Sequence, residues 1–186
     1  MNEQNAMTED HVKIIAGHGI RRERDFYPTP PECTVALVDF LEYSGAEIGR
    51  VWECAAGDGA IADVLEKRWY DVVQTDISTG TDFLTAPLPE GVNWIITNPP
   101  FNLAEAFIRR AASFDIPFAF LLKSQFWHSR KRYSLFNEHR PQYVLPLTWR
   151  PDFTGQGASL MDVLWCVWNM NKGQNSTIYC PLTKPN

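Results

Sequence analysis

The hydrophobic positions of this chain form short apolar runs that alternate with segments of helical periodicity. Runs typical of buried strands cover residues 50–54, 71–77, 92–97 and 118–122, and helical patterns cover residues 31–44, 60–68 and 103–112. A further strand near Phe83 is expected to be a stub at most. Strands that alternate with helices predict an α/β domain with a doubly wound, mostly parallel sheet.

The last third of the chain departs from this alternation. A basic helix is expected over residues 129–138, and strands are expected over residues 143–147 and 161–168 with no convincing helix between them. Two such strands predict a C-terminal antiparallel hairpin added to the parallel sheet. We therefore expect a mobile N-terminal arm over residues 1–25, one domain over residues 26–172 and a C-terminal tail over residues 173–186.

The composition is that of an ordinary soluble globular protein, with 186 residues of which 45% are hydrophobic and 21% are charged. No apolar run approaches the roughly 20 residues of a membrane span, and the first ten residues are too polar for a signal peptide. We therefore expect a cytoplasmic protein without membrane contact. The four cysteines and four histidines lack the clustered spacing of a zinc site, so no metal is expected.

Charge is distributed unevenly along the chain, although the net charge is only −5. Residues 31–100 carry twelve acidic and three basic residues, whereas residues 102–150 carry eight basic and three acidic ones. The basic segment also contains Trp127 and Tyr133, and this mixture suits a phosphate backbone with an unpaired base. The simpler alternative is a solvated helix face. The nucleic-acid-binding candidates are Lys123, Arg130, Lys131 and Arg132.

In a doubly wound sheet, ligands bind beyond the carboxyl ends of the strands, where the strand order reverses. The first such end carries the stretch 53–59, Glu-Cys-Ala-Ala-Gly-Asp-Gly, whose small residues allow a ligand to approach the backbone. A tight turn needs glycine in any case, so this stretch is weak evidence alone. It lacks the third glycine of a dinucleotide site and the Gly-Lys-Ser/Thr of a triphosphate site.

The second strand end offers carboxylates. Asp76 closes the expected strand 23 residues after Glu53, a position where an acid often binds ribose hydroxyls. Asp82 and Phe83 follow and could offer a carboxylate and a ring to an adenine. Solvated acids and a core phenylalanine are the alternative interpretation.

The third strand end carries Asn98-Pro99-Pro100-Phe101. Two prolines directly after an apolar strand fix the backbone and remove two N–H donors, so the segment presents acceptors. The Asn98 side-chain oxygen and the Pro99 carbonyl suit an –NH2 group that must become nucleophilic. A neighbouring aromatic ring can hold a planar substrate by stacking.

These features together resemble the gamma class of DNA N6-adenine amino-methyltransferases, and especially its small forms common in bacteriophage and prophage genomes. The resemblance covers residues 26–170 and includes the Tyr-Pro-Thr-Pro opening at residues 27–30 and an aromatic strand at residues 165–168. It implies a Rossmann-like class I methyltransferase sheet and S-adenosylmethionine as cofactor. The Asn-Pro-Pro-aromatic motif is specific for amino methylation but not for DNA.

The resemblance also implies roles for individual residues. Thr29 and Pro30 would line the methionine end of the cofactor, Asp76 would bind its ribose, and Phe101 would stack on a base flipped out of double-stranded DNA. The full cofactor-binding set would be Tyr27, Thr29, Pro30, Glu53, Ala55, Gly57, Asp76, Asp82, Phe83 and Asn98, and the catalytic set would be Asn98, Pro99, Pro100 and Phe101.

The sequence departs from this family in two places. Only five residues separate Asp76 from Asp82, which curtails the usual helix and third strand, and no sizeable target-recognition domain follows the motif. We therefore expect methylation of adenine in a short or degenerate sequence context. The alternatives are methyl transfer to RNA adenine or to a protein glutamine, and a cofactor-binding module without catalysis. The oligomeric state stays open.

Overall fold

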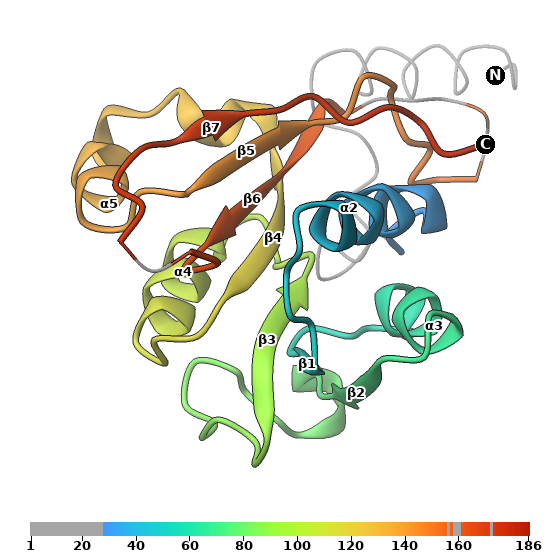
Figure 1. Ribbon diagram of the computed structural model, residues 1–186. Coiled ribbons are helices and arrows are strands. Elements are labelled where there is room, and N and C mark those ends of the chain that lie inside the picture. Colours follow the sequence, from blue (N-terminus) through green and yellow to red (C-terminus); the bar gives the residue numbers. More distant parts are fainter. Residues whose placement is uncertain (1–27, 156, 158–160, 172) are drawn as a thin grey trace, which may run out of the picture.

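The structure is a computed structural model that describes residues 28–155, 157, 161–171 and 173–186 (Figure 1). Tyr27 and the expected N-terminal arm over residues 1–25 lie outside these residues. The described chain forms one seven-stranded sheet with the order β2-β1-β3-β4-β6-β5-β7. The strands are β1 (Arg50–Glu53), β2 (Asp71–Gln74), β3 (Val92–Thr97), β4 (Phe118–Lys123), β5 (Tyr143–Pro146), β6 (Val163–Trp168) and β7 (Ile178–Tyr179).

Pairing within the sheet confirms the expected mixture of directions. Strands β2, β1, β3 and β4 are mutually parallel, and β6 is antiparallel to both of its neighbours, β4 and β5. Because β5 and β7 pair in parallel, β6 alone runs against the other six strands. The carboxyl ends of β1 to β5 therefore lie along the same edge of the sheet. The chain has the predicted α/β architecture with a C-terminal antiparallel hairpin.

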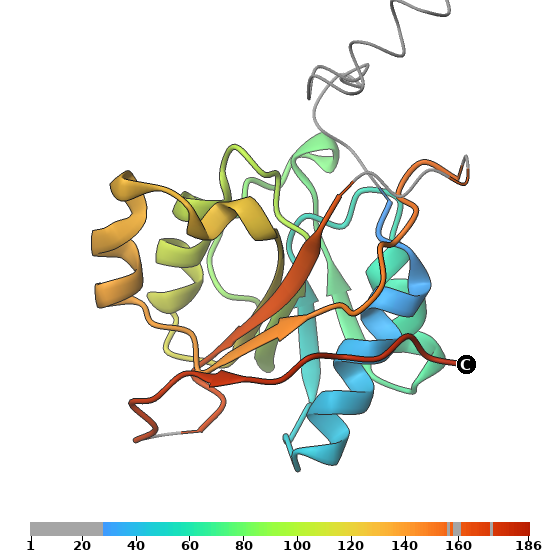
Figure 2. The same ribbon diagram turned by 90° about the horizontal axis from the view of Figure 1, so that it is seen from above.

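The helices cover both faces of the sheet. Helices α2 (Pro31–Tyr43) and α3 (Ala60–Lys67) lie on one face, and α4 (Ala104–Ala112) and α5 (Tyr133–Glu138) lie on the other (Figures 1 and 2). Successive strand residues point to opposite faces, so each strand supplies both cores: Trp165 packs with the α2 side and Cys166 with the α4 side. This two-sided burial explains why the central strands are uninterrupted apolar runs.

Apart from shifts of one to three residues at the ends of elements, three segments differ from the sequence predictions. The expected strand stub at Phe83 is a turn, in which the N–H groups of Thr85 and Ala86 donate to the Asp82 carbonyl oxygen. The expected helix over residues 129–138 is divided into a short 3-10 helix η3 (Arg130–Arg132) and α5. Within residues 173–186, expected as a tail, β7 pairs with β5, and Leu182 is buried in the core.

Candidate active site

The candidate site lies where the strand order reverses. From β1 the chain passes to β2 on one side and then returns to β3 on the other side of β1. The segments that leave the carboxyl ends of β1 and β3 diverge at this point, which opens a crevice in folds of this kind. Glu53 ends β1, and Asn98 directly follows β3. The structure thus brings the first and third predicted motifs to one edge of the sheet.

The turn between β1 and α3 depends on its glycines. Gly57 has φ +57° and Gly59 has φ +85°, a region that other residues rarely adopt. A Cβ atom on Gly59 would lie 3.0 Å from Gln74 Oε1, so a side chain at this position would displace the end of the exposed Gln74 side chain. Because the turn carries no bulky side chain there, a ligand can approach its backbone.

The buried side chain of Glu53 stabilises the start of α3, which follows this turn. Its side chain is only 1% exposed, and its Oε2 accepts a 2.7 Å hydrogen bond from the Ala62 N–H in the first turn of α3. The Gly59 N-cap has no side-chain acceptor, so Glu53 supplies one. Burial raises the pKa of Glu53 to about 8; the Ala62 hydrogen bond lowers it, and the nearby acids, Asp58 first, raise it.

Asp76 connects the ends of β1 and β2. It lies two residues beyond the end of β2, and its Oδ2 accepts a 3.0 Å hydrogen bond from the Gly57 N–H. Its Oδ1 accepts from the Ser78 N–H and the Ser78 hydroxyl at 2.8 and 2.6 Å. Asp82 is also half-buried, and its Oδ1 accepts from the Leu84 N–H at 2.9 Å. The Gly57 turn and Asp76, predicted to bind one cofactor, are thus in direct contact.

Phe83 lies in the core. It is 2% exposed, and its ring packs against Trp52 and Phe107 with centroid distances of 5.1 and 4.7 Å. This is the alternative interpretation considered from the sequence. A ring enclosed in this way offers no open face to an adenine, so the structure does not favour that role for Phe83.

Asn98 is held by the segment that precedes α2. Its Nδ2 donates a 3.1 Å hydrogen bond to the hydroxyl of Thr29, although the two residues are 69 positions apart. Its Oδ1 is buried and has no hydrogen-bond partner among the described residues. A buried acceptor without a donor is costly, and such atoms in native proteins call for an explanation. The side-chain oxygen of Asn98 is therefore an unused acceptor, and an N–H donor that reached it would satisfy it.

Phe101 is half-buried and contacts a cation. The ammonium of Lys123, the last residue of β4, lies 3.9 Å from the centroid of its ring, in cation–π geometry. Both residues line a cavity of about 190 Å³, together with Phe126 and Arg132. Lys123 was predicted to contact nucleic acid, but its contact with Phe101 depends on the pairing of β3 with β4 and was not predicted.

The predicted basic residues divide into two groups. Arg130 and Lys131 are exposed on η3. Arg132 instead donates a 3.0 Å hydrogen bond to the Phe126 carbonyl oxygen, and its guanidinium lies 4.1 Å from the centroid of the Phe126 ring. Arg132 therefore fixes the 3-10 helix η2 (Ser124–Trp127) to η3.

Cys54 follows Glu53 at the same edge but is not placed as a nucleophile. It is buried, and burial raises the pKa of its thiol well above the ordinary value, so the thiol is protonated at neutral pH. Within the described residues, no three His, Cys, Asp or Glu side chains converge to hold a metal ion. No helix in that part of the chain is long and apolar enough to cross a membrane.

Comparison with known proteins identifies solved structures with a similar fold. No family model and no curated protein matches the sequence. A protein from Listeria monocytogenes assigned as a class I S-adenosylmethionine-dependent methyltransferase aligns with a TM-score of 0.56 and 15% identity, over 92% of this chain and 71% of that one. A protein from Pyrococcus horikoshii assigned as an RNA methyltransferase aligns with a TM-score of 0.54 and 16% identity, over 89% and 100%.

A third similar structure is assigned as the modification subunit of a type I restriction enzyme from Vibrio vulnificus. It aligns with a TM-score of 0.54 and 13% identity, and the alignment covers 100% of this chain but 54% of that one. At such low identity these likenesses concern the fold alone. The chain has the Rossmann-like fold of class I methyltransferases.

Proposed function

We propose that this protein transfers a methyl group from S-adenosylmethionine to the exocyclic N6 amine of adenine in DNA. The observation that carries this proposal is the unpaired, buried Oδ1 of Asn98, held at the end of β3 by the Thr29 hydroxyl. An exocyclic amine can donate one N–H to this oxygen and a second to the carbonyl of Pro99. The half-buried ring of Phe101 lies in the same four-residue motif and suits a planar base.

The residues at this edge fit the cofactor. The Gly57 and Gly59 turn has no bulky side chain, and the half-buried carboxylates of Asp76 and Asp82 are suitable acceptors for ribose hydroxyls and an adenine amine. Thr29 and Pro30 would line the methionine end, together with Glu53, Ala55 and Gly57. When bound, S-adenosylmethionine supplies an electrophilic methyl group on a positively charged sulfur.

The protein's own groups act by position and electrostatics. As the amine nitrogen bonds to the methyl carbon, the methyl–sulfur bond breaks and the nitrogen becomes positively charged until it releases a proton to solvent; the oxygens of Asn98 and Pro99 stabilise that charge. Phe101 holds the base by stacking, and the prolines keep the acceptors in place without any reorganisation. Since the Cys54 thiol is protonated and buried, we infer direct transfer without a covalent enzyme intermediate.

Three lines of support favour DNA as acceptor. The Tyr-Pro-Thr-Pro opening resembles DNA enzymes, the segment from residue 102 to 150 is basic, and one similar structure is assigned as a restriction-enzyme modification subunit. An RNA methyltransferase is also among the similar structures, so RNA is the second candidate. Because basic side chains contact phosphates whatever the base sequence, we propose a short or degenerate target sequence and a flipped target base in double-stranded DNA.

The test is an acceptor assay with the purified protein. Methyl-labelled S-adenosylmethionine is incubated with separate DNA, RNA and protein pools, and the products are digested and identified by mass spectrometry. N6-methyladenine in DNA is the expected product. If the label is found only in RNA or on protein glutamine, that molecule and not DNA is the acceptor. Failure to bind S-adenosylmethionine in calorimetry would refute the enzyme assignment.

A further inference from the structure

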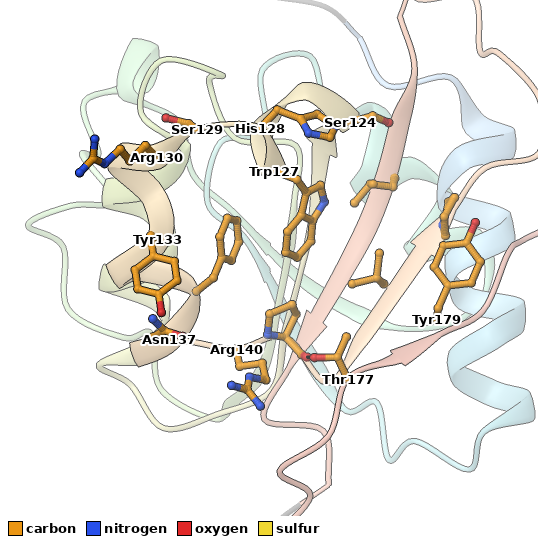
Figure 3. Close-up of a pocket in the computed structure, with 15 residues that line it drawn as sticks. Ser124, Trp127, His128, Ser129, Arg130, Tyr133, Asn137, Arg140, Thr177 and Tyr179 are labelled. Atoms are coloured by element: carbon orange, nitrogen blue, oxygen red, sulfur yellow. Dashed lines mark hydrogen bonds between the residues drawn. The ribbon is translucent and has the colours of Figure 1, made fainter.

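The antiparallel half of the sheet carries an open groove that the proposed function does not use. It encloses about 1080 Å³ between η2, η3 and α5 on one side and the face of β5, β6 and β7 on the other (Figure 3). Pockets for small molecules enclose about 300–1,000 Å³, so the volume of this groove lies just above that range. It exists because α5, with six residues, covers only part of this face.

Aromatic rings form much of the groove. Trp127 stacks on Phe136, with centroids 4.2 Å apart and ring planes 17° from parallel, so its orientation is fixed by packing. Tyr133 lies across from Tyr179 in Figure 3, and the two side chains are 73% and 68% exposed. The pairing of Val144 with Tyr179 places this tyrosine beside the strand face that forms the floor. Fixed or exposed ring faces of this kind suit planar ligands.

The charged residues of the groove all have the same sign. Arg130 and Arg140 line it together with His128, and none of the lining residues that the structure describes is acidic. This is unusual for a chain with a net charge of −5. Aromatic stacking surfaces combined with positive charge are typical of sites for single-stranded nucleic acid, since base faces are exposed only in an unpaired strand.

The groove begins close to the proposed reaction site. Ser124, one of its lining residues, directly follows Lys123, whose ammonium contacts the ring of Phe101. Phe126 lines the smaller cavity beside Phe101, and its ring contacts Phe136 of the groove at a centroid distance of 5.7 Å. The two sites therefore share the helix η2 as a common wall.

We propose that this groove binds an unpaired stretch of the DNA strand that carries the target adenine. Bases stack on Trp127 and Tyr133, and phosphates lie beside Arg130 and Arg140. The identity of the acceptor rests on the function proposed above. The groove gives the protein a preference for single-stranded or locally opened DNA over the closed duplex.

Fluorescence anisotropy with an end-labelled DNA oligonucleotide of about 12 nucleotides, without cofactor, tests this directly. Single-stranded DNA binds more tightly than the duplex of the same sequence. Tyr133→Ala weakens single-strand binding about 5- to 150-fold, the effect of losing one stacked base. Arg140→Gln reduces the slope of log affinity against log salt by about 0.7. Both residues are exposed, so these variants keep the packing of Trp127.

The matched control is Tyr43→Ala, because Tyr43 is 93% exposed at the end of α2 and outside the groove. Unchanged affinity in Tyr133→Ala, an equal loss in the control, or equal binding of the duplex overturns the proposal. Tighter binding of RNA of the same sequence overturns the choice of DNA.

A parallel methylation assay separates this proposal from the proposed function. If wild-type protein methylates adenine while both groove variants bind DNA normally, the groove proposal fails alone. If single-stranded DNA binds through the groove but no acceptor is methylated, the proposed function fails alone.

Discussion

The two halves of the sheet present different groups to a ligand, the parallel half at its carboxyl edge and the antiparallel half on the face beside α5. In the parallel half, polar groups are held by specific partners: Glu53 by the Ala62 N–H, Asp76 by the Gly57 N–H, and Asn98 by Thr29. In the antiparallel half, exposed aromatic and basic side chains surround an open groove.

This difference suggests that the parallel half positions the reacting groups and that the antiparallel half binds nucleic acid. Groups that must stabilise charge on one reacting atom need fixed positions, because reorganisation during the reaction would reduce their effect. Side chains that bind a chain of repeating phosphates and bases need only an approximate fit. Changes in the parallel half should therefore affect catalysis and cofactor binding, and changes in the antiparallel half should affect nucleic-acid binding and its salt dependence.

Asn98→Ala is expected to have the largest effect. Loss of one oriented acceptor for a developing charge typically costs about 10²–10³ in rate. Binding of S-adenosylmethionine, measured by calorimetry, should change little, because in the proposed mechanism the Asn98 oxygen contacts the amine and not the cofactor. Asn93→Ala, at an exposed position of the same strand, serves as control. Full turnover in Asn98→Ala would show that the catalytic assignment is wrong.

Comparison of the wild type with Glu53→Gln should show that Glu53 makes the free energy of unfolding depend on pH. In the folded protein the pKa of Glu53 is raised from 4.5 to about 8, so the folded state retains a proton that the unfolded state releases. Wild-type stability should therefore fall as pH rises from about 4.5 to about 8, relative to the neutral glutamine variant, by on the order of a few kcal/mol.

Thermal unfolding of both proteins across this pH range measures the effect. Glu90→Gln, at an exposed glutamate, controls for the loss of one charge. A constant difference between wild type and Glu53→Gln at all pH values would contradict the assignment.

Asp76→Ala should weaken cofactor binding by roughly 1–3 kcal/mol, the usual scale for hydrogen bonds to a charged group. The substitution also removes the acceptor of the Gly57 and Ser78 N–H groups, so the turn itself becomes less ordered. Calorimetry measures the affinity, with Asp71→Ala, an exposed acid at the start of β2, as control. Wild-type affinity in Asp76→Ala would reassign the ribose contact, with Asp82 as the next candidate.

The smallest effect is expected from the exposed cations of η3. Neutralising Arg130 and Lys131 together should weaken DNA binding about equally for all sequences and reduce the salt slope by about 2. Arg132→Ala should instead lower stability, since Arg132 bonds the Phe126 carbonyl. Salt titrations of binding and thermal unfolding distinguish the two. Loss of binding to one sequence only would show that these residues read bases.

The sequence predicted those elements whose local pattern is strong. The strand over residues 92–97 has the bounds of β3, because an uninterrupted apolar run needs burial on both faces. The two residues of β7 could not be predicted, since exposed Ile178 and Tyr179 form a strand only because the edge of β5 is available. The burial of Phe83 could not be predicted for a similar reason, because the sequence pattern around an aromatic residue does not distinguish a ring that lines a site from one that fills the core.

The sequence predicted which motifs form the candidate site, but it did not predict the contacts between their side chains. Strand ends and glycine spacing led us to assign Gly57 and Asp76 to one cofactor site; their hydrogen bond shows that they lie side by side, and their role in cofactor binding stays a prediction. The unpaired oxygen of Asn98 and the cation–π contact of Lys123 with Phe101 depend on side-chain geometry that no pattern contains. The groove was missed because Thr177 and Tyr179 reach it from a segment expected to be a tail.

The strand order also determines when each half can form during synthesis. All four strands of the parallel half have been made once residue 123 has left the ribosome, and of these strands only β4 still lacks a neighbour, β6. Strand β5 must wait, because β6, which lies between it and β4, is made about twenty residues later. Since chains generally fold from the N-terminal side as they emerge, the nascent chain can complete the edge with Asn98 before the groove has a floor.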